Sequence, residues 1–133
     1  MNRIVATWVG RVAYEPAWEL QRLVAELRAE ERLPDTMLLL EHDHVYTLGK
    51  RGSESEILFD EAERASRGVE VVRSDRGGLV TYHGPGQLVG YPIFNLGPKA
   101  DIVGFVCRLE NTMIGAAARL GVQARRVDGL PGV

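Results

Sequence analysis

The residues best suited to chemistry lie in one glycine-rich stretch, residues 76–87, with the sequence RGGLVTYHGPGQ. Gly77 and Gly78 allow the backbone to approach a ligand closely or to adopt a positive φ, which residues with a Cβ atom resist. Arg76 precedes them and adds a permanent cation with a planar fork of N–H donors. The first part of the stretch therefore has groups that can hold a polar ligand against the backbone.

The second part of the stretch offers side-chain groups. Thr81, Tyr82 and His83 place a hydroxyl, a phenol and an imidazole in successive positions, and each can hydrogen-bond a polar ligand group. A glycine-rich β-hairpin whose polar residues only satisfy turns explains the same composition equally well. Two phosphate-binding motifs are excluded, because a P-loop ends in GK[ST] and a dinucleotide-binding turn has the spacing G-x-G-x-x-G.

Two histidines further upstream form an H-x-H motif. His42 and His44 stand beside Glu41 and Asp43 and, on a strand, would point to the same face, which could suit a metal ion. No third ligand follows at a matching spacing. We therefore predict no metal site, and we expect these histidines to be solvated or to order a loop.

The single cysteine, Cys107, falls in a segment with helical periodicity. A free cysteine is among the most buried residue types and usually acts as a small hydrophobic side chain. We therefore expect Cys107 to be a packing residue, and a hydrolase that uses Cys107 with His83 is only a distant alternative.

These groups must be positioned by the strands and helices that the sequence predicts. β-Branched and apolar runs predict strands at residues 4–9, 36–41, 45–48, 69–73, 87–94 and 122–127. Helical spacing predicts helices from Pro16 to Arg32, from 60 to 65 and from 101 to 120. Pro92 predicts that its strand is an edge strand or is irregular there. The order of elements is typical of one α/β domain over residues 1–133.

The composition excludes several classes of protein. Of the 133 residues, 45% are hydrophobic and 26% are charged, which excludes a disordered, collagenous or coiled-coil chain. The net charge of -2, without a basic cluster, argues against nucleic acid or an anionic membrane as a partner. One cysteine fits a reducing compartment, and the N-terminus resembles neither a signal peptide nor a membrane span. We therefore expect a cytoplasmic protein.

Taken together, these motifs resemble the lipoyl(octanoyl) transferases, a family of acyltransferases of lipoate biosynthesis. The resemblance covers most of the chain. It rests on EHDHVYTLGKRG at 41–52, DRGG at 75–78, RGGLVTYHGPGQLVGYPIFNL at 76–96, RLEN at 108–111 and RRVDGLPGV at 125–133.

The resemblance implies an α/β domain with a mixed sheet flanked by helices, the biotin/lipoate protein ligase-like fold. It implies transfer of an octanoyl or lipoyl group from acyl carrier protein to a lysine of a lipoyl domain, through a thioester on a cysteine that a nearby lysine activates, with no cofactor. The implied partners are octanoyl-acyl carrier protein, the lipoyl domains of 2-oxoacid dehydrogenase complexes and the H protein of glycine cleavage.

The resemblance also implies the residues of the site. The substrate-binding residues would be Arg76, Gly77, Gly78, Leu79, Val80, Thr81, Tyr82 and His83, and the supporting residues would be His42, Gly86, Gln87 and Tyr91. Residues 76–83 would line one pocket, in which Leu79 and Val80 face the acyl chain while Tyr82 and His83 bond its carbonyl end or the incoming groups. Arg76, as a loop residue, is expected to add little to the core.

The family's lysine and cysteine would lie beyond Val133, and the chain ends on the turn-like segment DGLPGV. We therefore expect no catalytic residue within residues 1–133, and we expect this chain to be the N-terminal portion of an octanoyltransferase catalytic domain. Two alternatives remain open. One is an ATP-dependent lipoate-protein ligase of the same fold, although such a ligase would have a different glycine-rich box, R-R-x-x-G-G-G. The other is a non-catalytic acyl-binding fragment.

Overall fold

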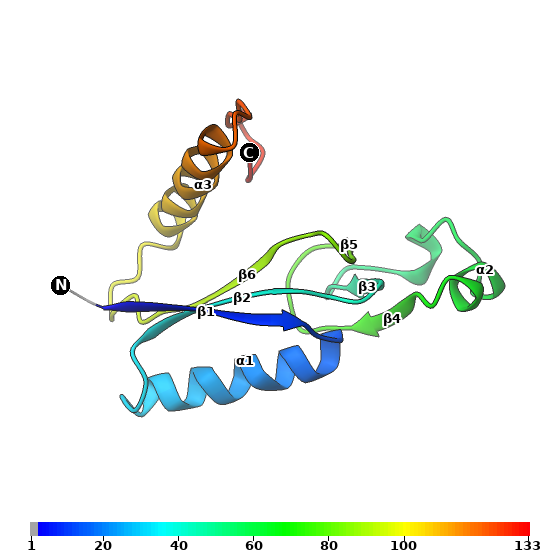
Figure 1. Cartoon of the computed structure of the whole chain (residues 1–133), viewed down its shortest axis with the longest axis horizontal. Helices are drawn as coiled ribbons and strands as arrows, with labels where there is room; N and C mark the ends of the chain where they lie inside the picture. Colours follow the sequence, from blue (N-terminus) through cyan, green and yellow to red (C-terminus); the bar gives the residue numbers. More distant parts are fainter. Residues whose placement is uncertain (1–2) are drawn as a thin grey trace. The chain divides into compact units, whose positions relative to one another are not determined.

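The computed structural model describes residues 3–133, which form two compact units (Figure 1). Unit 1 extends to Asn95, and unit 2 is Leu96–Val133. All the strands belong to unit 1, and the long helix α3 belongs to unit 2.

The first sheet of unit 1 has three strands in the order β1-β2-β6. The strands are β1 (Ile4–Arg11), β2 (Asp35–Glu41) and β6 (Val89–Ile93). β1 pairs with β2 in parallel and β6 pairs with β2 antiparallel, so the sheet is mixed. β6 is an edge strand, which confirms the prediction made from Pro92, because an edge position tolerates a residue without an N–H donor.

Helix α1 (Tyr14–Ala29) lies along one face of this sheet (Figure 1). It begins two residues before Pro16, which therefore sits in the first turn, where an N–H group has no partner within the helix. Its end is attached to the sheet by Asp35, whose carboxylate accepts a hydrogen bond from Arg28 Nε at 2.6 Å and another from the Asn95 N–H at 3.0 Å. The Asn95 N–H and, less strongly, Arg28 lower the pKa of Asp35 against the effect of burial.

The second sheet of unit 1 has the order β4-β3-β5. β3 (Val45–Leu48) pairs in parallel with β4 (Glu70–Arg73) and antiparallel with β5 (Val80–His83). The segment between β3 and β4 contains a 3-10 turn η1 (Glu54–Glu56) and the short helix α2 (Glu61–Ser66). α2 starts where the sequence predicts it, because the Asp60 side chain caps its first turn.

The two sheets are connected by one two-stranded antiparallel ribbon, whose pairing is interrupted between the β2–β6 pair and the β3–β5 pair. β2 continues into β3, and β5 continues into β6, so that Leu40 pairs with Val89 before the interruption and Val45 pairs with His83 after it. Between these pairs, the four residues 41–44 face the five residues 84–88. The Gly86 N–H donates to Glu41 Oε2 across the interruption at 2.8 Å. The extra residue acts like a β-bulge, which bends a ribbon and redirects its side chains.

Unit 2 contains α3 (Ile102–Arg119), which confirms the predicted helix. Asp101 caps its start by accepting from the Gly104 N–H at 2.8 Å, and Gly121 follows its end with a φ of 77°. Among the described residues, no helix has both the length and the apolar character needed to cross a membrane.

The strand predicted at 122–127 is wrong. In its place, side chains fasten the C-terminal residues of the chain to α3. The buried Glu110 accepts from Arg126 Nε at 2.6 Å and from the Gly132 N–H at 2.9 Å, while Arg126 also donates to the Cys107 carbonyl and to Asn111 Oδ1. Only an isolated bridge between Val127 and Leu130 has strand-like pairing. We call this arrangement the Glu110–Arg126 clasp.

The clasp generates a prediction about the order of the C-terminal residues. Glu110→Gln replaces a carboxylate that holds two donors by a neutral amide, so we expect the Gly132 amide hydrogen to exchange faster with solvent. Hydrogen exchange followed by NMR measures this rate. Glu30→Gln is the control, because the Glu30–Arg32 pair is exposed and its loss should leave exchange at Gly132 unchanged. An unchanged rate in Glu110→Gln would show that the clasp does not order this segment.

Candidate functional site

The predicted substrate-binding stretch is divided between two faces of β5. Tyr82 pairs with Tyr46 across the ladder, whereas His83 pairs with Val45. Because side chains alternate along a strand, Tyr82 and His83 point to opposite sides of the sheet. They cannot bond the same carbonyl group, so the expectation of a single pocket lined by residues 76–83 is corrected. We call the two sides the His83 face and the Tyr82 face.

The His83 face carries a cluster of aromatic rings. His83 stacks on Tyr14 with centroids 6.4 Å apart and lies 5.5 Å from His42, which in turn lies 5.9 Å from Tyr91. His83 Nδ1 lies 2.7 Å from Gln87 Oε1, an acceptor, so Nδ1–H donates and Nε2 is the nitrogen left for another partner. Two of the predicted supporting residues, His42 and Gln87, thus lie next to His83, and a third, Tyr91, lies next to His42.

His42 is fully buried where β2 passes into the interruption. Its Nδ1–H donates to the Val12 carbonyl at 2.8 Å, so Nε2 accepts from the Tyr91 hydroxyl at 2.7 Å. Burial lowers the pKa of His42 and outweighs the opposing effect of the bond to Val12. His42 is therefore a neutral, loop-ordering residue, and the alternative that it is solvated is wrong.

Tyr91 remains a phenol at any physiological pH. Burial, together with the nearby Tyr14, raises the pKa of Tyr91 to about 12, against an opposing bond from Gln21. The Tyr91 hydroxyl therefore keeps its hydrogen and donates it to His42. This bond fixes the orientation of the His42 imidazole, which lies beside the ring of His83.

Arg76 is a structural residue, contrary to the expectation that it adds little to the fold. Its Nε donates to Thr47 Oγ1 at 3.0 Å, and its terminal nitrogens donate to the carbonyl groups of Thr47, Gly77 and Leu79. Thr47 is fully buried in β3. The guanidinium therefore joins the glycine-rich loop to the strand beside it, and little of its donor capacity is left for a ligand.

Close contacts between backbone segments form at two further glycines, Gly49 and Gly52. A Cβ atom on Gly49 would lie 2.6 Å from the Gly78 carbonyl oxygen, and one on Gly52 would lie 2.9 Å from that of Leu79. A Cβ atom on Gly77 would have no neighbour within 4 Å. Gly78 has a φ of 88°, a backbone conformation that glycine adopts readily and other residues resist. Loop 49–52 thus packs closely against residues 76–79. The two glycines that allow this packing are those of the motif EHDHVYTLGKRG at 41–52.

Gly77 and Gly78 keep two backbone donors available. Their carbonyl groups accept from Arg76 and Arg51, but neither N–H has an acceptor among residues 3–133. Two successive N–H groups of this kind can bind a carbonyl or carboxylate oxygen. The neighbouring Leu79 is half exposed, and its side chain adds apolar surface beside them.

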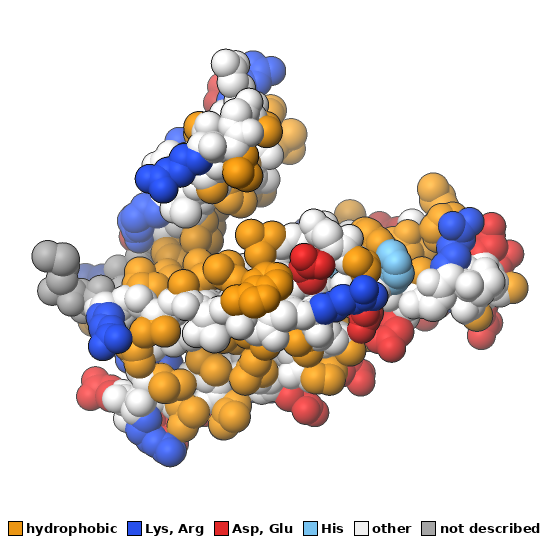
Figure 2. Space-filling view, viewed as in Figure 1, with side chains coloured by type: hydrophobic (Ala, Val, Ile, Leu, Met, Phe, Trp, Pro, Cys, Tyr) orange, Lys and Arg blue, Asp and Glu red, His pale blue; other side chains and the backbone are white. Residues whose placement is uncertain are grey.

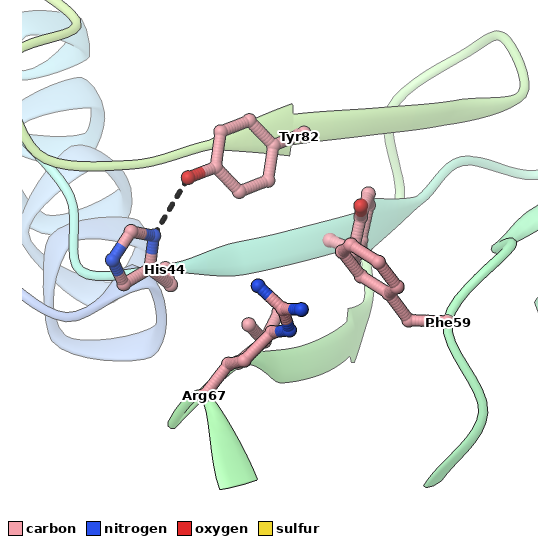
Figure 3. A pocket seen from close by; sticks show the side chains of 6 residues that line it. His44, Phe59, Arg67 and Tyr82 are labelled. Carbon is pink, nitrogen blue, oxygen red and sulfur yellow. Dashed lines mark hydrogen bonds between the residues drawn. The ribbon is translucent and has the colours of Figure 1, made fainter. Parts of the chain in front are cut away.

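The Tyr82 face is hollowed by a cavity of about 450 Å³, drawn in Figure 3. Its lining residues are His44, Tyr46, Phe59, Arg67, Val69 and Tyr82. His44 Nδ1 lies 2.6 Å from the Tyr82 hydroxyl, the bond drawn as a dashed line. Sequence analysis missed this cavity, because Phe59 and Arg67 come from the segment between β3 and β4 and carry no motif.

The two histidines of the H-x-H motif have different roles. His42 belongs to the buried cluster of the His83 face, and His44 bonds Tyr82 beside the cavity. Within residues 3–133, no group of three or more His, Cys, Asp and Glu side chains is placed to hold a metal ion. Cys107 is exposed on α3, whereas the sequence predicted a packing residue.

Acidic and basic side chains are interspersed over unit 1 in the view of Figure 2, as the net charge of -2 leads one to expect.

Comparison with known sequences gives consistent results. Residues 13–133 match the profile of the lipoyl protein ligase A/B catalytic domain. The chain is 49% identical over 126 residues to an octanoyltransferase of Mycolicibacterium gilvum, covering 95% of this chain and 50% of that protein. It is 46% identical over 134 residues to an octanoyltransferase of Chloroflexus aurantiacus, covering 100% and 60%. The chain thus spans from half to three fifths of the length of these relatives.

Solved structures show the same fold. A bi-partite lipoate protein ligase from Thermoplasma acidophilum superposes with a TM-score of 0.68 at 18% identity, over 96% of this chain and 48% of that one. A lipoate-protein ligase A bound with ATP superposes with a TM-score of 0.62 at 17% identity, over 96% and 51%. The prediction of a mixed α/β fold of the biotin/lipoate protein ligase type is confirmed.

The packed loops predict opposite results for two glycines. In Gly49→Ala, the added Cβ would overlap two backbone oxygens that cannot move without separating loop 49–52 from residues 76–79. We expect a loss of about 1–3 kcal/mol in the free energy of unfolding, measured by urea denaturation. Gly77→Ala is the control and should change this free energy by less than about 0.5 kcal/mol. Equal losses in the two variants would contradict the close approach.

The neutral, buried His42 predicts a pH dependence of stability. Its pKa is lower in the folded state than its ordinary value of 6.5, so the unfolded chain binds the proton first as the pH falls. We expect the free energy of unfolding to decrease as the pH falls below about 6.5, before the carboxylates begin to titrate near pH 4. His42→Gln should be less stable at pH 7 and should lose less stability between pH 7 and pH 5. An equal pH dependence in both proteins would contradict the assignment.

Proposed function

Because the chain belongs to the family of the lipoyl protein ligase A/B catalytic domain, we propose that it forms the N-terminal part of an octanoyltransferase of lipoate biosynthesis. The octanoyl group moves from acyl carrier protein to a lysine side chain of a lipoyl domain. The acceptors are the lipoyl domains of 2-oxoacid dehydrogenase complexes and the H protein of glycine cleavage. The single cysteine in 133 residues supports a cytoplasmic location.

One observation of the structure carries the proposal. The stretch that the sequence singled out is held rigidly by Arg76 and Thr47, yet its free groups are those that an acyl thioester needs. Two backbone donors at Gly77 and Gly78 have no acceptor among the described residues, and His83 keeps Nε2 free. A rigid loop with free donors favours binding of a polar carbonyl group without reorganisation.

The His83 face is the side that we assign to the acyl substrate. His83 rests on Tyr14 and on the neutral His42, so its ring is fixed while Nε2 is left to bond the carbonyl oxygen or the incoming group. Tyr82, on the opposite face, is not part of this site in our proposal. Gly86 and Glu41 support it from the interruption, where their hydrogen bond holds the turn that follows His83.

The transfer proceeds in two steps, first to a cysteine of the enzyme and then to the lysine of the acceptor. A cysteine thiolate attacks the thioester carbonyl, the bond to the carrier thiol breaks, and the octanoyl group becomes a thioester of the enzyme. The amine of the acceptor lysine then attacks this thioester, an amide forms, the amine loses its proton and the thiolate is released. A nearby lysine favours the thiolate by its positive charge.

No residue of this chain is assigned as the nucleophile. We propose that the cysteine and the lysine belong to the part of the relatives' length that this chain does not cover. The donor thioester is already activated, so the reaction requires neither ATP nor a metal.

The proposal predicts how octanoyl-acyl carrier protein binds and reacts. Calorimetry should show that His83→Ala and Gly77→Ala weaken binding of octanoyl-acyl carrier protein to this chain by about tenfold, because each removes or crowds one polar contact. Gly77→Ala should keep its stability, which separates a binding effect from a folding effect. Unchanged binding in both variants would contradict the assigned face.

Intact mass tests the chemistry. After incubation of the full-length enzyme with octanoyl-acyl carrier protein, we expect a gain of one octanoyl group that a thiol reagent removes, and transfer of that group to an added lipoyl domain. Cys107→Ser should leave the transfer intact. Use of free octanoate only when ATP is added would identify a ligase instead, and binding without any adduct would leave an acyl-binding protein.

A further inference from the structure

The cavity on the Tyr82 face has no role in the function proposed above. It lies on the side of β5 opposite to His83, and all its lining residues belong to unit 1. Its volume, about 450 Å³, falls within the range of small-molecule sites, about 300–1,000 Å³.

Aromatic rings make up much of the wall. Tyr46 and Tyr82 are cross-strand neighbours with centroids 5.4 Å apart, and Tyr82 is still 42% exposed. The His44 ring stacks beside Tyr82 and bonds its hydroxyl, which fixes the orientation of the phenol. Phe59 completes the wall from the segment before α2, as Figure 3 shows. The rings offer a fixed apolar surface for a flat ligand.

Arg67 supplies a cation beside these rings. It follows α2 as its C-cap residue, and its guanidinium carbon lies 4.7 Å from the centroid of Phe59. Stacking engages the face of the guanidinium and leaves its N–H edges free. Neither a carboxylate nor a carbonyl accepts from these N–H groups among residues 3–133.

The neighbouring Arg64 shows that this arrangement is particular to Arg67. Arg64 uses its terminal nitrogens on Glu54 at 3.3 Å and on the Phe59 carbonyl at 3.2 Å, so it is committed to the fold. Arg67 has the same charge, but it lies over the Phe59 ring and keeps its donors. The cavity thus combines aromatic walls with one unneutralised cation whose planar fork matches a carboxylate.

We propose that this cavity binds a small aromatic carboxylate. The ring of the ligand lies against Tyr46, Phe59 and Tyr82, and its carboxylate takes two parallel hydrogen bonds from Arg67. Aromatic contacts favour a flat ring over an aliphatic chain, and the single cation favours one negative charge over none.

Titration with 2-naphthoate, followed by NMR of the backbone amides, tests the proposal on this chain. We expect shifts at Tyr46, Arg67 and Val69, and little change at Gly77, Gly78 and His83. Arg67→Gln should weaken binding by about tenfold, since it removes the charged, bidentate partner. Arg73→Gln is the control, because Arg73 ends β4 and does not line the cavity. The neutral 2-naphthamide should bind the native chain about as weakly as 2-naphthoate binds Arg67→Gln.

Several results would overturn the proposal. Shifts confined to Gly77, Gly78 and His83 would place the ligand at the groups proposed to bind the octanoyl thioester instead. Equal binding of 2-naphthoate and 2-naphthamide would show that Arg67 does not recognise a carboxylate, and equal binding of octanoate at Tyr46 and Val69 would show that the walls do not select a ring. Arg67→Gln should bind octanoyl-acyl carrier protein like the native chain, so this proposal and the octanoyltransferase proposal can fail separately.

Discussion

The hydrogen bonds between Arg76 and Thr47 are the interaction on which both faces of the candidate site depend. Thr47 is buried in β3, and it receives the guanidinium on its hydroxyl and on its carbonyl oxygen. The same guanidinium holds the carbonyl groups of Gly77 and Leu79, so one side chain fixes the course of the loop that enters β5. A cation that satisfies several backbone acceptors defines a loop better than apolar contacts do, because each bond has a direction.

The course of this loop then decides what β5 can present. Once the register of β5 against β3 is fixed, the alternation of a strand sends Tyr82 to one side and His83 to the other. A slip of one residue would exchange the two faces and would place an imidazole where the aromatic cavity now lies. The interruption after His83, bridged by Gly86 and Glu41, lets the ribbon change register by one residue without disturbing this assignment. The fold therefore keeps two different binding surfaces on a single short strand.

Much of the fold could be predicted from the sequence because the signals were local. Strands β1 to β4, strand β6 and helix α3 follow from apolar runs and helical spacing, and Pro92 identified an edge strand. Strand β5 was not predicted, because its four residues lie inside the glycine-rich stretch. The strand expected at 122–127 did not form, because no strand within residues 3–133 pairs with this segment, and the Glu110–Arg126 clasp fixed it by side-chain bonds that no periodicity reveals. Local patterns predict elements, but they do not predict which buried charge will organise an irregular segment.

The candidate site was harder to predict, for a related reason. The glycine-rich stretch identified the residues, but neighbours in sequence were taken as neighbours in one pocket, which holds for a loop and fails for a strand. The histidines His42 and His44 are a second example. Their spacing of two residues would place both on one face of a continuous strand, but the interruption between β2 and β3 separates them, and they bond different tyrosines. In both cases the chemistry of each residue was clear from its type, whereas its partners depended on register. A motif on a strand therefore describes two faces, and each face needs its own functional argument.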